Sequence, residues 1–160
     1  MSFNEDSLEF EWLTWQQIEP YKELIAEWEN ETVIKYHYPD KIISKSYFDE
    51  RIEKLKNYLN FGNTFFLGIF YESKLIGYYW SYVMDFLFQK TWFENSSYLD
   101  ENFRGKGIGL LMKKLALNKA LEIGCTEAKS MYAPFNKAQE NLFLKLGFKI
   151  SRIEVTKRLK

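Results

Sequence analysis

A glycine-rich run in the second half of the chain has the residue types of an anion-binding loop. Gly105, Gly107 and Gly109 stand at alternate positions between a predicted strand and a predicted helix. Glycines there leave a row of backbone N–H groups, and the positive end of the helix dipole, open to a ligand. Arg104 and Lys106 add two positive charges beside them. This combination predicts a phosphate site, and the two flanking charges favour a diphosphate over a carboxylate.

Two common phosphate-binding motifs do not fit this run. A dinucleotide-binding fingerprint that starts at Gly105 needs glycine at position 110, where the chain has Leu110. A P-loop that ends at Gly105-Lys106 needs glycine at 100 and Ser or Thr at 107, and these positions hold Asp100 and Gly107. The glycines could also serve only a tight turn and close helix packing, and the residues alone leave that alternative open.

Hydrophobic periodicity predicts the elements that position this loop. Apolar residues at helical spacing predict helices at 14–28, 46–59, 107–123 and 136–146. Runs rich in β-branched and aromatic residues predict strands at 8–13, 64–71, 74–84, 91–99, 127–132 and 148–159. Glu72-Ser73 is predicted to be a two-residue turn, so three central strands form an antiparallel meander.

The long helix after the glycine loop is expected to cross over to a strand that runs parallel to 91–99. This arrangement makes the fold a mixed α/β fold. The side of the helix 107–123 that faces the sheet is predicted to carry Ile108, Leu111, Met112, Leu115 and Ala116.

Composition excludes several classes of protein. The 160 residues are the size of one domain, residues 1–160. Because 22 Lys and Arg balance 22 Asp and Glu, we expect no nucleic-acid partner. One Cys and one His can form neither an internal disulfide nor a structural zinc site, so we expect no metal. Without a long apolar run or a secretion signal, we expect a cytoplasmic protein with no membrane partner, and a homodimer stays open.

Two segments resemble signatures of the GCN5-related N-acetyltransferase (GNAT) superfamily. The run 104–109, after a strand that ends Tyr98-Leu99-Asp100, is similar to the Arg/Gln-x-x-Gly-x-Gly/Ala loop that binds acetyl-CoA. The run 136–148 is similar to the family's Asn-x-x-Ala-x-x-x-Tyr-x-x-x-Gly-Phe segment. The upstream helix pair and the meander also follow the family order. The resemblance implies the acyl-CoA N-acyltransferase fold, a central, mostly antiparallel sheet flanked by about four helices.

The resemblance also implies roles for individual residues. The pantetheine arm of acetyl-CoA would pair with the strand near Tyr98 and Leu99, and main chain near Leu99 would bind the thioester carbonyl. Asn136 would cap the next helix and reach the pantetheine. Phe143 would lie beside the cofactor. The pyrophosphate would be held by the backbone amides of Arg104, Gly105, Lys106, Gly107, Ile108 and Gly109.

The match departs from the family at the position of its usual acid. The tyrosine that commonly protonates the departing CoA thiolate is Phe143 here, and Gln139 stands at the alanine position. Three explanations stay open: water protonates the thiolate, Tyr98 or Tyr132 substitutes, or the protein binds CoA with little catalysis. A thiolate is a good leaving group, because the pKa of a thiol is about 8.5, so loss of the acid need not abolish turnover.

The amine must lose a proton before it attacks, so a base or a water chain is needed. Glu94 on the strand 91–99 is the candidate, with Asp85 in reserve, although Glu94 could equally be a solvated strand residue. His37 lies in a loop that lines the acceptor pocket in this family, or is a surface histidine. Cys125 is expected to be a buried structural thiol.

The sequence therefore predicts an enzyme that transfers acetyl from acetyl-CoA to a primary amine of a small molecule, by direct attack in a ternary complex. One alternative is a CoA-binding sensor or interaction module with lost or weak catalysis. Another is an acetyltransferase of protein N-termini or lysines, with an open groove instead of a closed pocket. The rings expected to line the acceptor pocket are those of Tyr36, Tyr38, Tyr79 and Trp92.

Overall fold

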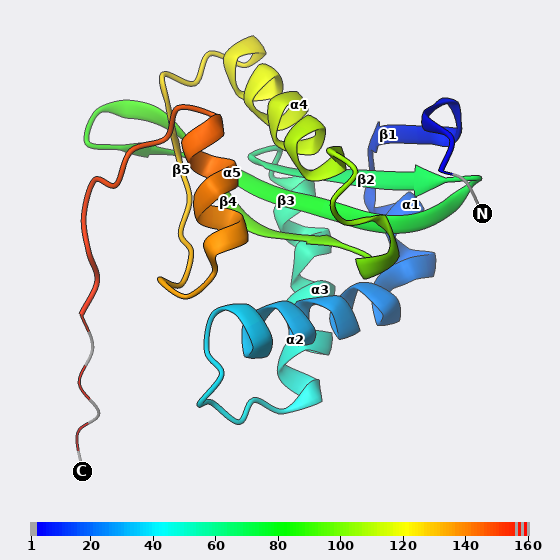
Figure 1. The fold of residues 1–160 in the computed structure, drawn as a ribbon, viewed down its shortest axis with the longest axis horizontal. Helices are drawn as coiled ribbons and strands as arrows, with labels where there is room; N and C mark the ends of the chain where they lie inside the picture. Colours follow the sequence, from blue (N-terminus) through cyan, green and yellow to red (C-terminus); the bar gives the residue numbers. More distant parts are fainter. Residues whose placement is uncertain (1–2, 156, 158, 160) are drawn as a thin grey trace.

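The computed structural model describes residues 3–155, 157 and 159 and contains a five-stranded sheet with helices on both faces (Figure 1). The strands lie side by side in sequence order, and all neighbours are antiparallel except the last pair, which is parallel. They are β1 (Leu8–Trp12), β2 (Thr64–Tyr71), β3 (Lys74–Phe86), β4 (Gln89–Leu99) and β5 (Glu127–Lys129). The mixed α/β fold with its parallel crossover is confirmed.

Helices cover the two faces of the sheet unequally. They are α1 (Trp15–Ile18), α2 (Lys22–Tyr36), α3 (Lys45–Asn60), α4 (Ile108–Glu122) and α5 (Lys137–Lys145). The first three pack with Phe66, Tyr78 and Trp80 in one core, whereas α4 packs with Ile69, Tyr79 and Trp92 in the other. Within the described part of the chain, no helix combines the length and apolar character needed to cross a membrane.

The first predicted helix is divided by a proline. Pro20 lies in a 3-10 turn, Glu19–Tyr21, between α1 and α2. Proline has no backbone N–H to continue the helical bonding pattern, so one predicted helix becomes two. Thr14 begins α1 as predicted, and the side-chain oxygen of Gln17 accepts from its backbone N–H at 2.9 Å.

Tight turns join the strands of the meander. Glu72 and Ser73 have φ values of 49° and 63°, the paired left-handed conformation of a two-residue hairpin turn, so the predicted turn is confirmed. Leu87 and Phe88 have φ values of 50° and 65° and form the second turn. β3 therefore extends to Phe86, two residues beyond its predicted end.

A β-bulge in β4 marks the place where the sheet opens. Trp80 of β3 faces Ser96 and the next residue of β3 faces Glu94, so Asn95 is the extra residue. β5 pairs with β4 only from Thr91 to Phe93, after which the two parallel strands part. The predicted strand 127–132 consequently ends at Lys129, because the chain beyond it has left the ladder.

Two other predictions are wrong. Leu111 is 44% exposed, and Lys113 is the buried residue at 2% exposure, because α4 presents a slightly different face to the sheet. The strand predicted at 148–159 is absent from its described residues, 148–155, 157 and 159, which run away from the sheet (Figure 1). Alternation of Ile153 and Val155 can form a strand only beside a pairing partner, and both side chains are more than 80% exposed.

Candidate active site

The glycine loop presents consecutive backbone donors that the protein does not use. Gly107 is the N-cap of α4 with a φ of 83°, and Gly105 has a φ of 77°. Among the described residues, none accepts a hydrogen bond from the backbone N–H groups of 105–109. The next amide, of Leu110, donates to the carbonyl of Gly107 at 3.0 Å. Five free donors at the positive end of a helix form a binding site for an anion.

The space above this loop is open. A Cβ atom placed on Gly105 or Gly107 would meet no heavy atom within 4 Å. The glycines therefore are not needed for close packing against the protein. Their positive φ values, which disfavour other residues, turn the amides outward, so the purely structural alternative explains only part of the pattern.

The charged side chains of the loop, Arg104 and Lys106, hydrogen-bond to other groups of the protein and not to the open space above the glycines. Arg104 Nε donates to the carbonyl of Leu99 at 2.8 Å, and Nη1 donates to the hydroxyl of Tyr36 at 2.8 Å. The Arg104 amide donates to the carbonyl of Glu101, so it does not join the row of free amides. Lys106 Nζ donates to the carbonyl of Asn102 at 2.7 Å. Arg104 thus ties the end of β4 to α2.

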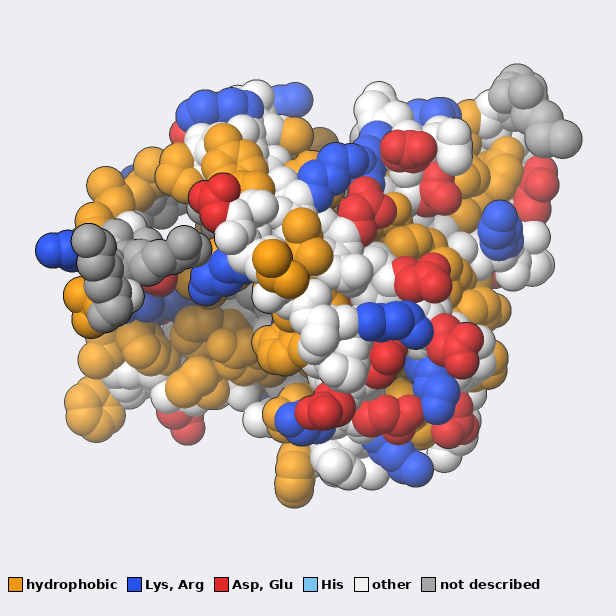
Figure 2. Space-filling view, turned by 90° about the horizontal axis from the view of Figure 1, so that it is seen from below, with side chains coloured by type: hydrophobic (Ala, Val, Ile, Leu, Met, Phe, Trp, Pro, Cys, Tyr) orange, Lys and Arg blue, Asp and Glu red, His pale blue; other side chains and the backbone are white. Residues whose placement is uncertain are grey.

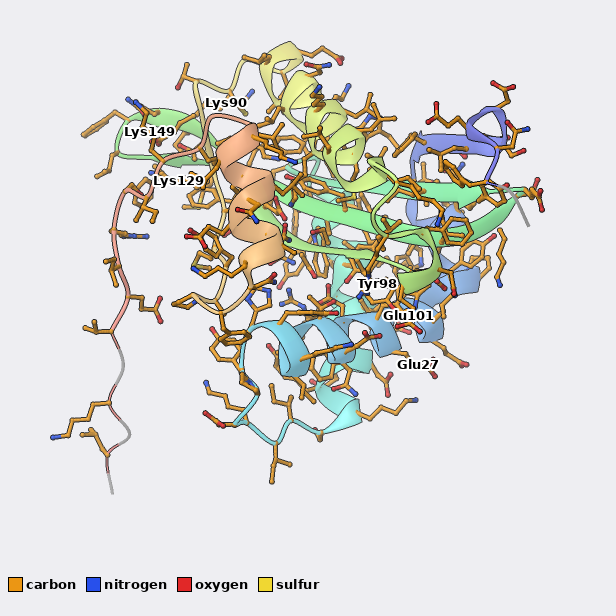
Figure 3. All side chains as sticks on the ribbon, viewed as in Figure 1. Glu27, Lys90, Tyr98, Glu101, Lys129 and Lys149 are labelled. Atoms are coloured by element: carbon orange, nitrogen blue, oxygen red, sulfur yellow. The ribbon has the colours of Figure 1, made fainter. Side chains whose placement is uncertain are left out.

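Strand β4 turns Tyr98 and Leu99 in different directions. The Tyr98 ring stacks on Trp28 of α2, and its hydroxyl donates to Glu31 at 2.9 Å. Figure 3 shows Tyr98 at the end of β4 that lies above α2. Burial and the neighbouring Glu31 raise the pKa of Tyr98 far above its usual value. Asp100 N–H bonds to Ile76 of β3, so the N–H of Leu99 points to the opposite edge, toward the gap beside β5.

Helix α5 closes the other side of the gap. Asn136 is its N-cap, and its side-chain oxygen accepts from the backbone N–H of Gln139 at 3.2 Å, so the predicted cap is confirmed. Phe143 is 4% exposed and packs against Tyr132 and Phe148 with ring centroids 5.9 and 5.0 Å away. Of the two tyrosines considered as substitutes for the family acid, Tyr132 lies beside Phe143, whereas Tyr98 lies on the α2 side.

A buried ion pair links α4 to β4 at the point where the strands part. Lys113 Nζ hydrogen-bonds Glu94, and the two side chains are 3% and 9% exposed. Ser97 Oγ also donates to Glu94, at 3.1 Å, and Lys113 lies 4.6 Å from the centroid of the Phe143 ring. Burial lowers the pKa of Lys113 against the opposing effect of Glu94. Sequence reasoning missed Lys113, because a lysine in a helix is normally placed at the surface.

The rings predicted to line an acceptor pocket do not gather in one place. Tyr79 and Trp92 are buried against α4, where the indole N–H of Trp92 donates to the Tyr79 hydroxyl at 2.9 Å. Tyr36 binds Arg104, and Tyr38 is 47% exposed. Alternation along a strand says which residues share a face but not which face is hollow.

A cavity of about 450 Å³ lies elsewhere, between α3 and the face of the sheet that α4 does not cover. It reaches the bulge of β4 at Asn95, whose buried side-chain nitrogen has no hydrogen-bond partner within the described structure. Its lining residues are Tyr47, Glu50, Arg51, Lys54, Tyr58, Asn63, Thr64, Trp80, Tyr82 and Asn95.

The other ionisable residues that the sequence singled out, which are Asp85, His37 and Cys125, do not line this cavity. Asp85 is exposed near the β3–β4 turn and faces Lys90 across the hairpin. His37 ends α2, and burial lowers its pKa. Cys125 is buried, which raises the pKa of its thiol, as expected for a structural cysteine.

The fold and this site together define a protein of the acyltransferase class. The acetyltransferase (GNAT) family profile matches residues 5–148. The chain therefore belongs to the acetyltransferase (GNAT) family and is an acetyltransferase. Members of this family use acetyl-CoA.

Solved structures of other acetyltransferases share the fold. An aminoglycoside acetyltransferase, meta-AAC0020, from an uncultured soil metagenomic sample has a TM-score of 0.73 at 19% identity, covering 98% of this chain and 99% of that chain. A ribosomal-protein-alanine N-acetyltransferase from Brucella melitensis biovar Abortus 2308 has a TM-score of 0.69 at 14% identity, covering 96% and 99%. AAC(6')-Iy, solved with the bisubstrate analog CoA-S-monomethyl-acetylneamine, has a TM-score of 0.71 at 13% identity, covering 96% and 98%. No curated protein sequence matches the chain.

Proposed function

We propose that the protein transfers an acetyl group from acetyl-CoA to a primary amine of a small molecule, by direct attack within a ternary complex. The observation that carries this proposal is a row of five amides, 105–109, that have no partner among residues 3–155, 157 and 159, beside the gap between β4 and β5. A pyrophosphate needs several converging donors, and an extended thiol-bearing arm needs an unpaired strand edge. This chain offers both next to each other.

Several features of the described residues support a CoA site. The open space over Gly105 and Gly107 leaves room for the pyrophosphate on the free amides. The N–H of Leu99 is directed toward the gap, where it would donate to the thioester carbonyl. Asn136 caps the start of α5, whose Phe143 lies near Ala128 and Lys129 of β5. Acetyl-CoA supplies the activated acetyl group, and the protein supplies position and hydrogen bonds.

Glu94 is the group we propose to accept the proton of the amine through a chain of water in the opening between β4 and β5, because its carboxylate lies on the α4 face and the acceptor cavity lies on the opposite face. Its carboxylate is held by Lys113 and Ser97 at the opening of the strands, where it is shielded from bulk water. Phe143 has no proton to donate, so the thiolate leaves unassisted, or is protonated by water or by Tyr132 beside it.

An aromatic cavity supports a small-molecule acceptor. The cavity reaches β4 at Asn95, from the face opposite α4. Its walls include Tyr47, Tyr58, Trp80 and Tyr82, and concave sites lined by rings are typical of small ligands. Tyr47 and Tyr58 are 51% and 43% exposed, so the cavity opens to the surface.

The cofactor assignment is tested by acetyl-CoA titration calorimetry with Gly109→Glu and Gly109→Gln. Gly109 does not have a positive φ, and an added Cβ would meet only Leu142 Cδ2 at 3.8 Å, so both variants should fold. We expect the glutamate to weaken binding at least about tenfold more than the isosteric glutamine, because it sets a negative charge beside the pyrophosphate. Equal affinity in the two variants would overturn the assignment.

Catalysis is tested by thiol release in the presence of a panel of primary amines. Release that depends on the amine and yields the N-acetyl product supports the proposed reaction. Tight binding of acetyl-CoA without turnover of any amine would favour the alternative of a CoA-binding module with lost catalysis.

A further inference from the structure

The cavity between α3 and the sheet has a charge balance that is unusual for an amine site. Its lining contains one acidic side chain, Glu50, against Arg51 and Lys54. Acidic and basic side chains are also intermingled over this helical side of the molecule, without a continuous acidic patch (Figure 2). A polycationic amine would meet a single carboxylate here, so the cavity does not have the character of a polycation site.

Arg51 is held rigidly while its outer donors stay free. Its Nε donates to Glu29 at 2.8 Å, and its guanidinium stacks 4.8 Å from the centroid of the Trp80 ring. Glu29 is fully buried, and its second oxygen accepts from the Tyr78 hydroxyl at 2.6 Å. Within the described structure, no group accepts a hydrogen bond from either terminal nitrogen of Arg51. A planar fork with two free ends is the donor geometry that a carboxylate matches.

Asn95 forms part of the wall of the same cavity. The bulge places Asn95 and Ser96 on one face of β4, where Ser96 hydrogen-bonds Tyr78 and Asn95 lines the cavity. Within the described structure, the Asn95 side-chain nitrogen is buried without a hydrogen-bond partner. The free fork of Arg51, surrounded by aromatic rings, favours a ligand with acceptor oxygens and an apolar body.

We propose that this cavity binds an acceptor amine that also carries a carboxylate, an amino-acid-like molecule with an apolar or aromatic side group. The carboxylate binds the terminal nitrogens of Arg51, and the side group lies among Tyr47, Tyr58 and Tyr82. A volume of about 450 Å³ suits a molecule of this size. This inference rests on the proposed function, because it names the acceptor of that reaction.

The test compares matched ligands that differ only in the carboxylate. Binding of phenylalanine and phenylethylamine, and of tryptophan and tryptamine, is measured by calorimetry on the CoA-saturated protein, with spermine as a polycationic probe. We expect each amino acid to bind at least about tenfold more tightly than its decarboxylated partner and than spermine. Equal or weaker binding of the amino acids would overturn the inference.

Variants assign the preference to Arg51. Removing Arg51 alone would leave Glu29 buried without its partner, so the double variant Glu29→Gln/Arg51→Met is used, with circular dichroism to check the fold. Lys56→Met is the control, because it removes an exposed positive charge from the same helix outside the cavity. We expect the preference for amino acids to disappear in the double variant and to persist in the control. A preference that persists in both would overturn the role of Arg51.

Binding and turnover separate this inference from the proposed function. If the amino acids bind preferentially but release no thiol, the transfer reaction fails and the ligand class stands. If decarboxylated amines are acetylated with the higher kcat/KM, the reaction stands and the ligand class is wrong.

Discussion

Lys113→Met tests whether the pair between Lys113 and Glu94 is a buried charge pair on which the fold depends. The side chains are only 3% and 9% exposed, and methionine has nearly the length of lysine without its charge. In the variant, Ser97 is the one hydrogen-bond donor left to the buried Glu94 carboxylate within the described part of the chain. Removing one partner of a buried pair costs about 3–5 kcal/mol, which exceeds the loss of an exposed charge by a wide margin. For 160 residues this corresponds to a decrease in Tm of about 9–15 °C.

The assay is denaturant and thermal unfolding followed by circular dichroism, with a control on the next residue of the helix. Lys114→Met makes the same change at an exposed position and should alter the unfolding free energy by less than about 0.5 kcal/mol. Lys113→Met/Glu94→Gln should recover most of the loss, because no unpaired charge stays buried. The reasoning is refuted if Lys113→Met costs no more than Lys114→Met, or if the double variant costs the sum of the single ones.

The pH dependence of the same variant has a defined sign. Burial lowers the pKa of Lys113 in the folded protein below the 10.5 of the unfolded chain. Between these two values the unfolded chain binds more protons, so the free energy of unfolding rises with pH in the alkaline range just below 10.5. The advantage of the wild type over Lys113→Met should therefore increase as the pH rises toward 10.5. A difference that is constant or decreases would contradict the buried position of the lysine.

Three further substitutions test individual residues. Glu94→Gln should lower kcat by about 10²-fold or more with acetyl-CoA affinity retained, and unchanged kcat would exclude Glu94 as the base. Tyr98→Phe should lower the free energy of unfolding by about 1.5–3 kcal/mol, because it removes the bond to Glu31, and a 10²-fold fall in kcat would instead assign it an acid role. Asn136→Ala should lower the unfolding free energy by about 1 kcal/mol through loss of the α5 cap, and no change in chemical denaturation would show that the cap contributes nothing.

Local chemistry explains why most elements were predictable from the sequence. β2 begins at Thr64 and ends at Tyr71 as predicted, because alternation and the following turn both act over a few neighbouring residues. Helices α3, α4 and α5 lie within one or two residues of their predicted bounds. The predicted strand at 148–159 is wrong over its described residues, because a strand also needs a partner that the local pattern cannot supply.

The candidate site was only partly visible in the sequence. The glycine loop and the Asn136 cap are local features, and both lie where their residue types indicated. Arg51 and Lys113 were missed, since the surroundings of a charged helical residue depend on what packs against it. Aromatic residues also indicated an acceptor pocket, but the four rings predicted to line it do not gather in one place.

The sequence by itself determined the order of the strands β1 to β5 and of the helices α3 to α5, the family and the loop 105–109, because backbone conformation and residue spacing act over short distances. Tertiary structure decided that the amides of this loop stay unpartnered, that β4 and β5 part after Phe93, and that the bulge directs Asn95 into a cavity. These features require groups far apart in the chain to meet or to separate. A free donor, a gap between strands and a hollow are each defined by neighbours that only the folded chain brings together.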